Sequence, residues 1–207
     1  MPAKRKLLSV AKGALDEVVA YDGATTTQRD WSLWYNRKDR IMAAAQDFYK
    51  VGKDGGEKLL ESLQKDFRDE WVVTSTEIQY QFPSLEATVT HYFDSRVIQP
   101  MFMQGVVVPV YTYIPIEEVV KTEEGLRYLQ ALFQTKDDGE TIITALERLS
   151  GEKRARIKII TPLQHNREYY QNRAVFFRVD RGSFIVNCYD HVASLNGRSR
   201  GVRVRER

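Results

Sequence analysis

The sequence predicts an α+β protein with an N-terminal helical layer of about three helices, followed by a mainly antiparallel sheet with two inserted helices. Apolar residues recur at helical spacing through residues 1–71 and at the strand period of two in the segments that follow. Helix-like and strand-like segments come in runs rather than in strict alternation, which is typical of the α+β class. We expect the helical segment 1–71 and the sheet segment 72–207 to pack as a single compact unit. A chain of this length buries enough surface to be stable without a disulfide or a metal.

Three helices are predicted in the first third of the chain. Apolar spacing places the first over 4–20. Thr27, with Asp30 three residues later, resembles a capped helix start and predicts a second helix that continues to Gly52. Two glycines then break the pattern, and a third helix is predicted over 57–69.

The next segment predicts a hairpin over 76–91. Its two arms alternate apolar and polar residues on either side of a short Pro83–Ser84 turn. That register pairs Tyr80 with Ala87 and Ile78 with Val89 on an apolar face, and Gln81 with Glu86 and Glu77 with Thr90 on a polar face. It also places Thr76 and His91 on the apolar side, which favours a buried histidine with a hydrogen-bond partner.

The remaining elements follow the same patterns. They are a strand over 105–114, one or two helices over 116–133, a helix over 141–149, a short strand over 156–160, a hairpin over 174–189 and a last strand over 201–206. The hairpin contains Asp180-Arg181-Gly182, which predicts a three-residue loop with a type I turn and a left-handed glycine. The paired acids Glu123–Glu124 and Asp137–Asp138 are typical of helix N-termini.

Positive charge is concentrated at the C-terminal end of the chain. The whole chain has a net charge of +3, yet its last 53 residues hold eleven bases against four acids, and ten of those bases are arginine. Arginine presents a planar fork that suits phosphate and carboxylate groups. The alternative is that these arginines protect sheet edges and pair with the acidic segment before them.

We therefore predict a non-enzymatic binding protein whose basic C-terminal region contacts nucleic acid or an acidic protein partner, with no cofactor. The candidate contact residues are Arg167, Arg173, Arg198, Arg200, Arg203, Arg205 and Arg207. In a strand over 201–206 the period of two places Arg203, Arg205 and Arg207 on one face, about 6.6 to 6.8 Å apart. That spacing is close to the phosphate step of an extended single strand.

Aromatic residues near the start of the second predicted helix offer another nucleic-acid surface. Trp31, Trp34 and Tyr35 are interleaved with Arg29, Arg37, Lys38 and Arg40. Aromatic rings beside cations can stack bases while the cations hold phosphates. Helical spacing with Ile41 and Met42 favours the alternative, in which the rings are buried in a core or interface.

A metal-dependent or general-acid hydrolase, such as a nuclease, is the alternative function. It would use His91, His165 and His191, each of which has a carboxylate nearby in the sequence. The polar stretch 161–173 adds His, Arg and Tyr side chains capable of acid–base chemistry. The simpler interpretation is a solvated connection whose tyrosines cover the sheet. A third alternative is a structural subunit of a larger assembly, formed as a homo-oligomer.

Several common site types have no support in the sequence. The phosphate-loop, dinucleotide-binding, serine-hydrolase and HExxH motifs are absent. A single cysteine, Cys188, argues against disulfide frameworks and cysteine-based zinc sites, and its strand pattern predicts a buried small hydrophobe. With no apolar run long enough for a membrane span or signal peptide, we expect a cytoplasmic protein without membrane contact.

Overall fold

The computed structural model describes residues 18–19, 27–37, 40–81, 84, 86–91, 102–107, 113–161, 170–189, 197 and 199–203. The helices are α1 (Gln28–Asn36), α2 (Ala45–Asp54), α3 (Glu57–Asp69), α4 (Ile116–Val119), α5 (Glu123–Leu132), α6 (Gly139–Ser150) and the 3₁₀ turn η2 (Arg154–Arg156). The strands are β1 (Val18–Val19), β2 (Arg40–Met42), β3 (Val72–Gln81), β4 (Glu86–His91), β5 (Phe102–Val107), β6 (Ile114–Pro115), β7 (Ile157–Ile160), β8 (Tyr170–Asp180), β9 (Ser183–Asn187) and β10 (Gly201–Arg203).

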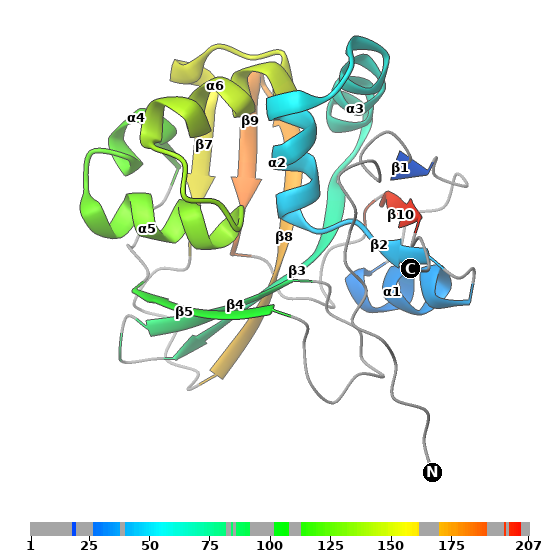
Figure 1. The fold of residues 1–207 in the computed structure, drawn as a ribbon, viewed down its shortest axis with the longest axis horizontal. Coiled ribbons are helices and arrows are strands. Elements are labelled where there is room, and N and C mark those ends of the chain that lie inside the picture. The colour runs from blue at the N-terminus through cyan, green and yellow to red at the C-terminus, as the bar shows by residue number, and fades with distance from the viewer. Residues whose placement is uncertain are drawn as a thin grey trace.

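The strands form two sheets. The larger sheet has seven strands in the order β5-β4-β3-β8-β9-β7-β6, and a small sheet has the order β1-β10-β2. Figure 1 shows the large sheet curling, since β7, β9 and β8 stand upright in the view while β4 and β5 turn across them. The protein is therefore α+β, as the sequence predicts.

The large sheet is mixed rather than antiparallel throughout. Strands β7 and β9 pair in parallel, whereas the other described neighbours in this sheet are antiparallel. Local patterning cannot specify this pairing, because the strands of a parallel pair are never joined by a tight turn. Here the whole of β8 lies between them in the sequence.

The hairpin of β3 and β4 has the predicted register. Tyr80 lies opposite Ala87, Ile78 opposite Val89, Gln81 opposite Glu86 and Glu77 opposite Thr90. The β8–β9 hairpin has a shorter turn than predicted, because Asp180 pairs with Ser183 and leaves only Arg181 and Gly182 in the loop. Both loop residues have positive φ, 48° and 71°, as a type I′ turn requires, so the predicted three-residue loop is wrong.

Two predicted N-terminal helices differ in the structure. Most of the predicted helix over 4–20 lies outside the described residues, but Val18 and Val19 form a strand that pairs with β10. The predicted second helix is divided into α1 and α2 by β2, which also pairs with β10. The apolar spacing continues across this break because β2 buries Met42 in the same cluster as α1. The third predicted helix coincides with α3.

Apolar residues gather on both faces of the large sheet. On one face, helices α2, α3, α5 and α6 cover the main core, in which Phe177 contacts Phe48 and Phe67. Neighbouring Phe176 points to the opposite face, as strand alternation requires, and packs there in a cluster with Trp31 and Tyr35 of α1. The N-terminal helices thus lie on both faces of the sheet instead of forming one layer. None of the described helices is long and apolar enough to span a membrane.

Candidate binding surface

Arg200, near the C-terminal end of the chain, is a core residue. Arg200 is buried, its Nε donates to Asp66 Oδ2 at 2.7 Å, and its Nη2 donates to Ser62 Oγ at 2.9 Å. This placement corrects the expectation that Arg200 contacts a partner. Arg203 lies in β10 opposite Arg40, so its backbone is a strand as predicted. The candidates Arg167, Arg198, Arg205 and Arg207 lie outside the described residues.

Two other bases of the C-terminal quarter share one row across the sheet. Arg178 of β8 lies opposite Ile185 of β9, and Ile185 lies opposite Lys158 of β7. Cross-strand neighbours point to the same face, so both bases lie on the face opposite the main core, to which Phe177 and Val186 belong. Adjacent strands are about 4.8 Å apart, which sets the two Cα atoms roughly 10 Å apart.

Each base in this row lies over an aromatic ring. The Arg178 guanidinium carbon is 5.4 Å from the Trp71 ring centroid, and the Lys158 Nζ is 5.4 Å from that of Tyr113. Arg178 Nε is buried, and none of the described residues accepts a hydrogen bond from it. We call Trp71, Tyr113, Lys158 and Arg178 the basic row.

Further bases surround the β8–β9 turn beside the basic row. Arg181 is exposed in the turn, and Arg156 Nη1 lies next to Gly182 while forming an ion pair of 3.7 Å with Glu152. Arg173, a predicted contact residue, lies over the Tyr189 ring at 5.3 Å. It is opposite Ile78 and therefore on the other face from the basic row. Of the predicted contact residues whose side chains the structure describes, Arg173 lies on the core face of β8 and Arg200 is buried beside Asp66.

His91 is a core residue, as the strand alternation favours. His91 Nε2 donates to the carbonyl of Ala131 at 3.0 Å, because a carbonyl oxygen can only accept. The neutral ring then has no proton on Nδ1, which accepts from Thr76 Oγ1 at 3.0 Å, while Thr76 Oγ1 accepts from the backbone N of Ala45 at 2.8 Å. Burial lowers the pKa of His91 to about 4, which keeps the ring neutral. Its ring nitrogens tie β4 to β3 and α5.

Cys188, His165 and His191 are the other candidates for catalytic or metal-binding residues. Burial raises the pKa of the Cys188 thiol to about 12, which keeps it in the unreactive thiol form. His165 and His191 lie outside the described residues. Within the described part of the chain, no three His, Cys, Asp or Glu side chains gather as metal ligands would.

The N-terminal aromatics hold the C-terminal segment in place. Trp31 Nε1 donates to the carbonyl of Gly197 at 2.6 Å, and Tyr35 OH donates to that of Ser199 at 3.1 Å. Both rings are buried beside Phe176. The core alternative for Trp31 and Tyr35 is therefore confirmed, and these two rings are not available to stack bases.

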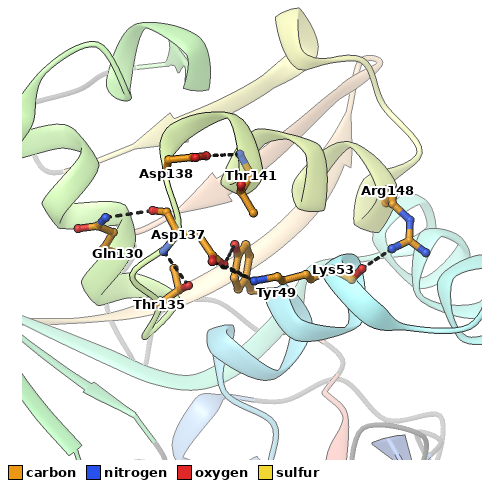
Figure 2. Close-up of polar contacts among 8 residues, drawn as sticks. All are labelled: Tyr49, Lys53, Gln130, Thr135, Asp137, Asp138, Thr141 and Arg148. Carbon is orange, nitrogen blue, oxygen red and sulfur yellow. Dashed lines mark hydrogen bonds and ion pairs between the residues drawn. The ribbon is translucent and has the colours of Figure 1, made fainter.

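A polar cluster joins the end of α2 to the connection between α5 and α6 (Figure 2). Asp137 accepts from Tyr49 OH at 2.6 Å and from Lys53 Nζ at 2.7 Å. These bonds, with Lys53 and then Tyr49 contributing most, lower the pKa of Asp137 to about 2. Arg148 donates to the carbonyl of Gly52 at 2.9 Å, where it complements the C-terminal end of α2. The cluster is a structural tether between helices.

We expect Asp137→Asn to destabilise the protein by about 1 kcal/mol, because a charge-assisted bond is weakened where the side chain is partly solvated. Since the pKa of Asp137 is lowered, its contribution is complete above about pH 4 and is lost as the pH falls toward about 2. Thermal unfolding of the variant and wild type at several pH values measures this. Glu118→Gln, which removes the exposed partner of Lys121, is the control. Equal losses for both variants would contradict the tether.

Comparisons with known proteins bear on the fold. No model of a known protein family matches the chain, and no curated protein matches it. A solved protein structure described as "Accommodation of massive sequence variation in Nanoarchaeota by the C-type lectin fold" superimposes with a TM-score of 0.51 and 10% identity. The match covers 91% of this chain and all of that one. This chain is similar to the C-type lectin fold.

Sequence reasoning missed most of the basic row. Its usable signal was the strand alternation of 156–160 and 174–189, which places Lys158 and Arg178 on the face opposite Ile159 and Phe177. The pairing of Tyr113 with Lys158 had no such signal, because it depends on β6 joining the far edge of the sheet.

Proposed function

We propose that this chain is a non-catalytic binding protein whose arginine-rich C-terminal quarter contacts nucleic acid. The observation that carries the proposal is the basic row, in which Arg178 and Lys158 each lie over an aromatic ring on one face of the sheet. A guanidinium that lies over a ring can still donate hydrogen bonds to a phosphate from its N–H edge.

The fold neighbour supports a recognition role. The Nanoarchaeota protein is described as a C-type lectin fold that accommodates massive sequence variation. A scaffold that tolerates many sequences on one backbone suits binding, because surface residues can change while the core is kept. The buried Trp31, Tyr35 and Arg200 anchor the C-terminal segment here.

The partner class follows from the rings. Nucleic acid offers both phosphates for the cations and bases for the half-exposed Tyr113 ring, whereas an acidic protein surface offers only carboxylates. We therefore place nucleic acid before an acidic protein partner.

A salt titration tests this function. We expect Arg178→Gln/Lys158→Gln to weaken binding of a single-stranded oligonucleotide and to make the slope of log K against log salt shallower by about 1.4, because two phosphate contacts are lost. Lys58→Gln/Lys65→Gln removes the same charge from exposed positions of α3 and should leave the slope nearly unchanged. Fluorescence anisotropy at salt concentrations from about 50 to 200 mM measures both.

Other outcomes would change the proposal. No affinity of the wild type at about 50 mM salt would remove nucleic acid as the partner. Equal slopes for the two double variants would remove the basic row. Arg203→Gln/Arg205→Gln/Arg207→Gln tests the last predicted strand in the same way, and a shallower slope at unchanged melting temperature would add it to the contact surface.

A further inference from the structure

Within the part of the chain that the structure describes, three residues other than glycine have a positive φ. They are Tyr113 at 61°, Gln134 at 46° and Arg181 at 48°. Tyr113 belongs to the basic row, and Arg181 lies in the β8–β9 turn beside it. Left-handed backbone is disfavoured for such residues, because the Cβ approaches the following carbonyl oxygen. Each of the three therefore needs a cause that offsets its strain.

The end of α5 explains the conformation of Gln134. This residue follows the C-cap Phe133, at the position where many helices end in left-handed backbone. Its backbone N donates to the carbonyl of Ala131 at 3.2 Å, and the backbone N of Thr135 donates to that of Gln130 at 2.9 Å. These are the two bonds of a Schellman motif, so the helix end alone accounts for Gln134.

Tyr113 and Arg181 keep side chains that their backbone positions disfavour. Arg181 is the first loop residue of the type I′ turn, a position that favours Asn, Asp or Gly. Tyr113 directly precedes β6 and is 45% exposed, so burial of its ring does not account for a tyrosine there. Arg181 is exposed as well. A side chain that is both strained and exposed fits a ligand contact.

We propose that the nucleic acid bound by the basic row is single-stranded, that one unpaired base stacks on Tyr113, and that Arg181 holds a phosphate. This inference rests on the proposed function. A surface ring stacks on a base that is unstacked from its neighbours, as in a single strand but not inside a duplex. Lys158 Nζ lies 5.4 Å from the centroid of the Tyr113 ring, so a phosphate contact and a base contact adjoin.

The two strained residues lie on opposite sides of the line that joins Lys158 to Arg178. Arg181 is three positions past Arg178 along β8 and its turn. Tyr113 is two positions before Pro115, the partner of Lys158, and lies in the other direction because β6 is antiparallel to β7. At about 3.4 Å per residue the two ends are roughly 17 Å apart. A few nucleotides of an extended strand span that distance.

Oligothymidine and an abasic oligomer of equal length separate base stacking from phosphate contact, because the two carry the same charge. We expect the wild type to bind oligothymidine about tenfold more tightly, as measured by fluorescence anisotropy. Tyr113→Asn should remove this difference, Tyr113→Phe should keep it, and neither should change the affinity for a blunt duplex. Arg181→Asn should weaken both oligomers alike, because it removes a phosphate contact.

Thermal unfolding adds a readout that moves in the opposite direction. Asparagine tolerates left-handed backbone, so Tyr113→Asn and Arg181→Asn should raise the melting temperature while they weaken binding. Gln134→Asn is the matched control, because it relieves the same conformation at the end of α5. It should raise the melting temperature and leave the affinity for oligothymidine unchanged.

Three outcomes would overturn the inference. Equal binding of oligothymidine and the abasic oligomer would remove the base contact and leave phosphate binding by the basic row in place. A loss of duplex affinity in Tyr113→Asn as large as the loss for oligothymidine would remove the requirement for an unpaired base. If the wild type bound none of these oligomers at about 50 mM salt, the proposed function would fail together with this inference.

Discussion

Arg200→Gln is expected to lower the unfolding free energy by about 3 to 5 kcal/mol, because it leaves the carboxylate of Asp66 buried without its cation. For a chain of this size the melting temperature should fall by about 10 °C. Thermal unfolding followed by circular dichroism measures the change. The effect is large because the pair joins the C-terminal segment to α3 across 134 positions of sequence.

Two further variants make the Arg200 prediction specific. Arg127→Gln breaks an exposed ion pair with Glu123 and should cost less than about 1 kcal/mol. Arg200→Met/Asp66→Leu removes both buried charges and should recover much of the lost stability. If Arg200→Gln kept the wild-type melting temperature but bound oligonucleotides more weakly, Arg200 would belong to the contact surface instead of the core.

Glu77→Gln is expected to stabilise the protein by about 2 kcal/mol at pH 8. Glu77 is 6% exposed between Thr90 of β4 and Ala174 of β8, and burial raises the pKa of its carboxyl to about 7. A raised carboxyl pKa means that the folded state holds the proton more tightly than the unfolded state. Ionisation of the wild type therefore costs stability as the pH rises from about 4.5 to about 7, whereas glutamine stays neutral.

The pH dependence identifies the cause of the Glu77 effect. The stability difference between Glu77→Gln and wild type should be small at pH 4.5, rise with pH and become constant above about pH 7. His91 acts in the opposite sense, since its lowered pKa adds stability as the pH rises from about 4 to 6.5, but this contribution is common to both proteins and cancels in the difference. Denaturant unfolding at five pH values measures it. A difference that does not vary with pH would show that ionisation of Glu77 is not its cause.

Local patterning predicted the elements whose partners are near in sequence. The β3–β4 register follows from alternation on both sides of a short turn. Asp138 caps α6, since its Oδ1 accepts from the backbone N of Thr141 at 2.8 Å. Elements that depend on distant partners were not predictable. Strand β2 forms because β10 pairs with it from more than 150 residues away, while its own apolar spacing continues that of a helix.

The candidate binding surface, too, could be predicted only in the features that local sequence determines. Charge counting predicted that the C-terminal quarter is basic, and alternation predicted the burial of His91 and Cys188. Neither could separate Arg200, which pairs with Asp66 inside the protein, from Arg178, which lies over Trp71. That distinction depends on which residues from the first third of the chain meet each arginine.

Mapping of backbone amide chemical shifts during titration with an oligothymidine at about 50 mM salt tests the proposed function most directly. We expect the largest shifts on β7, β8 and β9 around Lys158, Arg178 and Ile185, and we expect them to disappear as salt is raised. The exposed positions of α3 around Lys58 and Lys65 should not respond to this probe. Shifts confined to α3, or none on the basic row at saturating oligonucleotide, would contradict nucleic-acid binding by the C-terminal quarter.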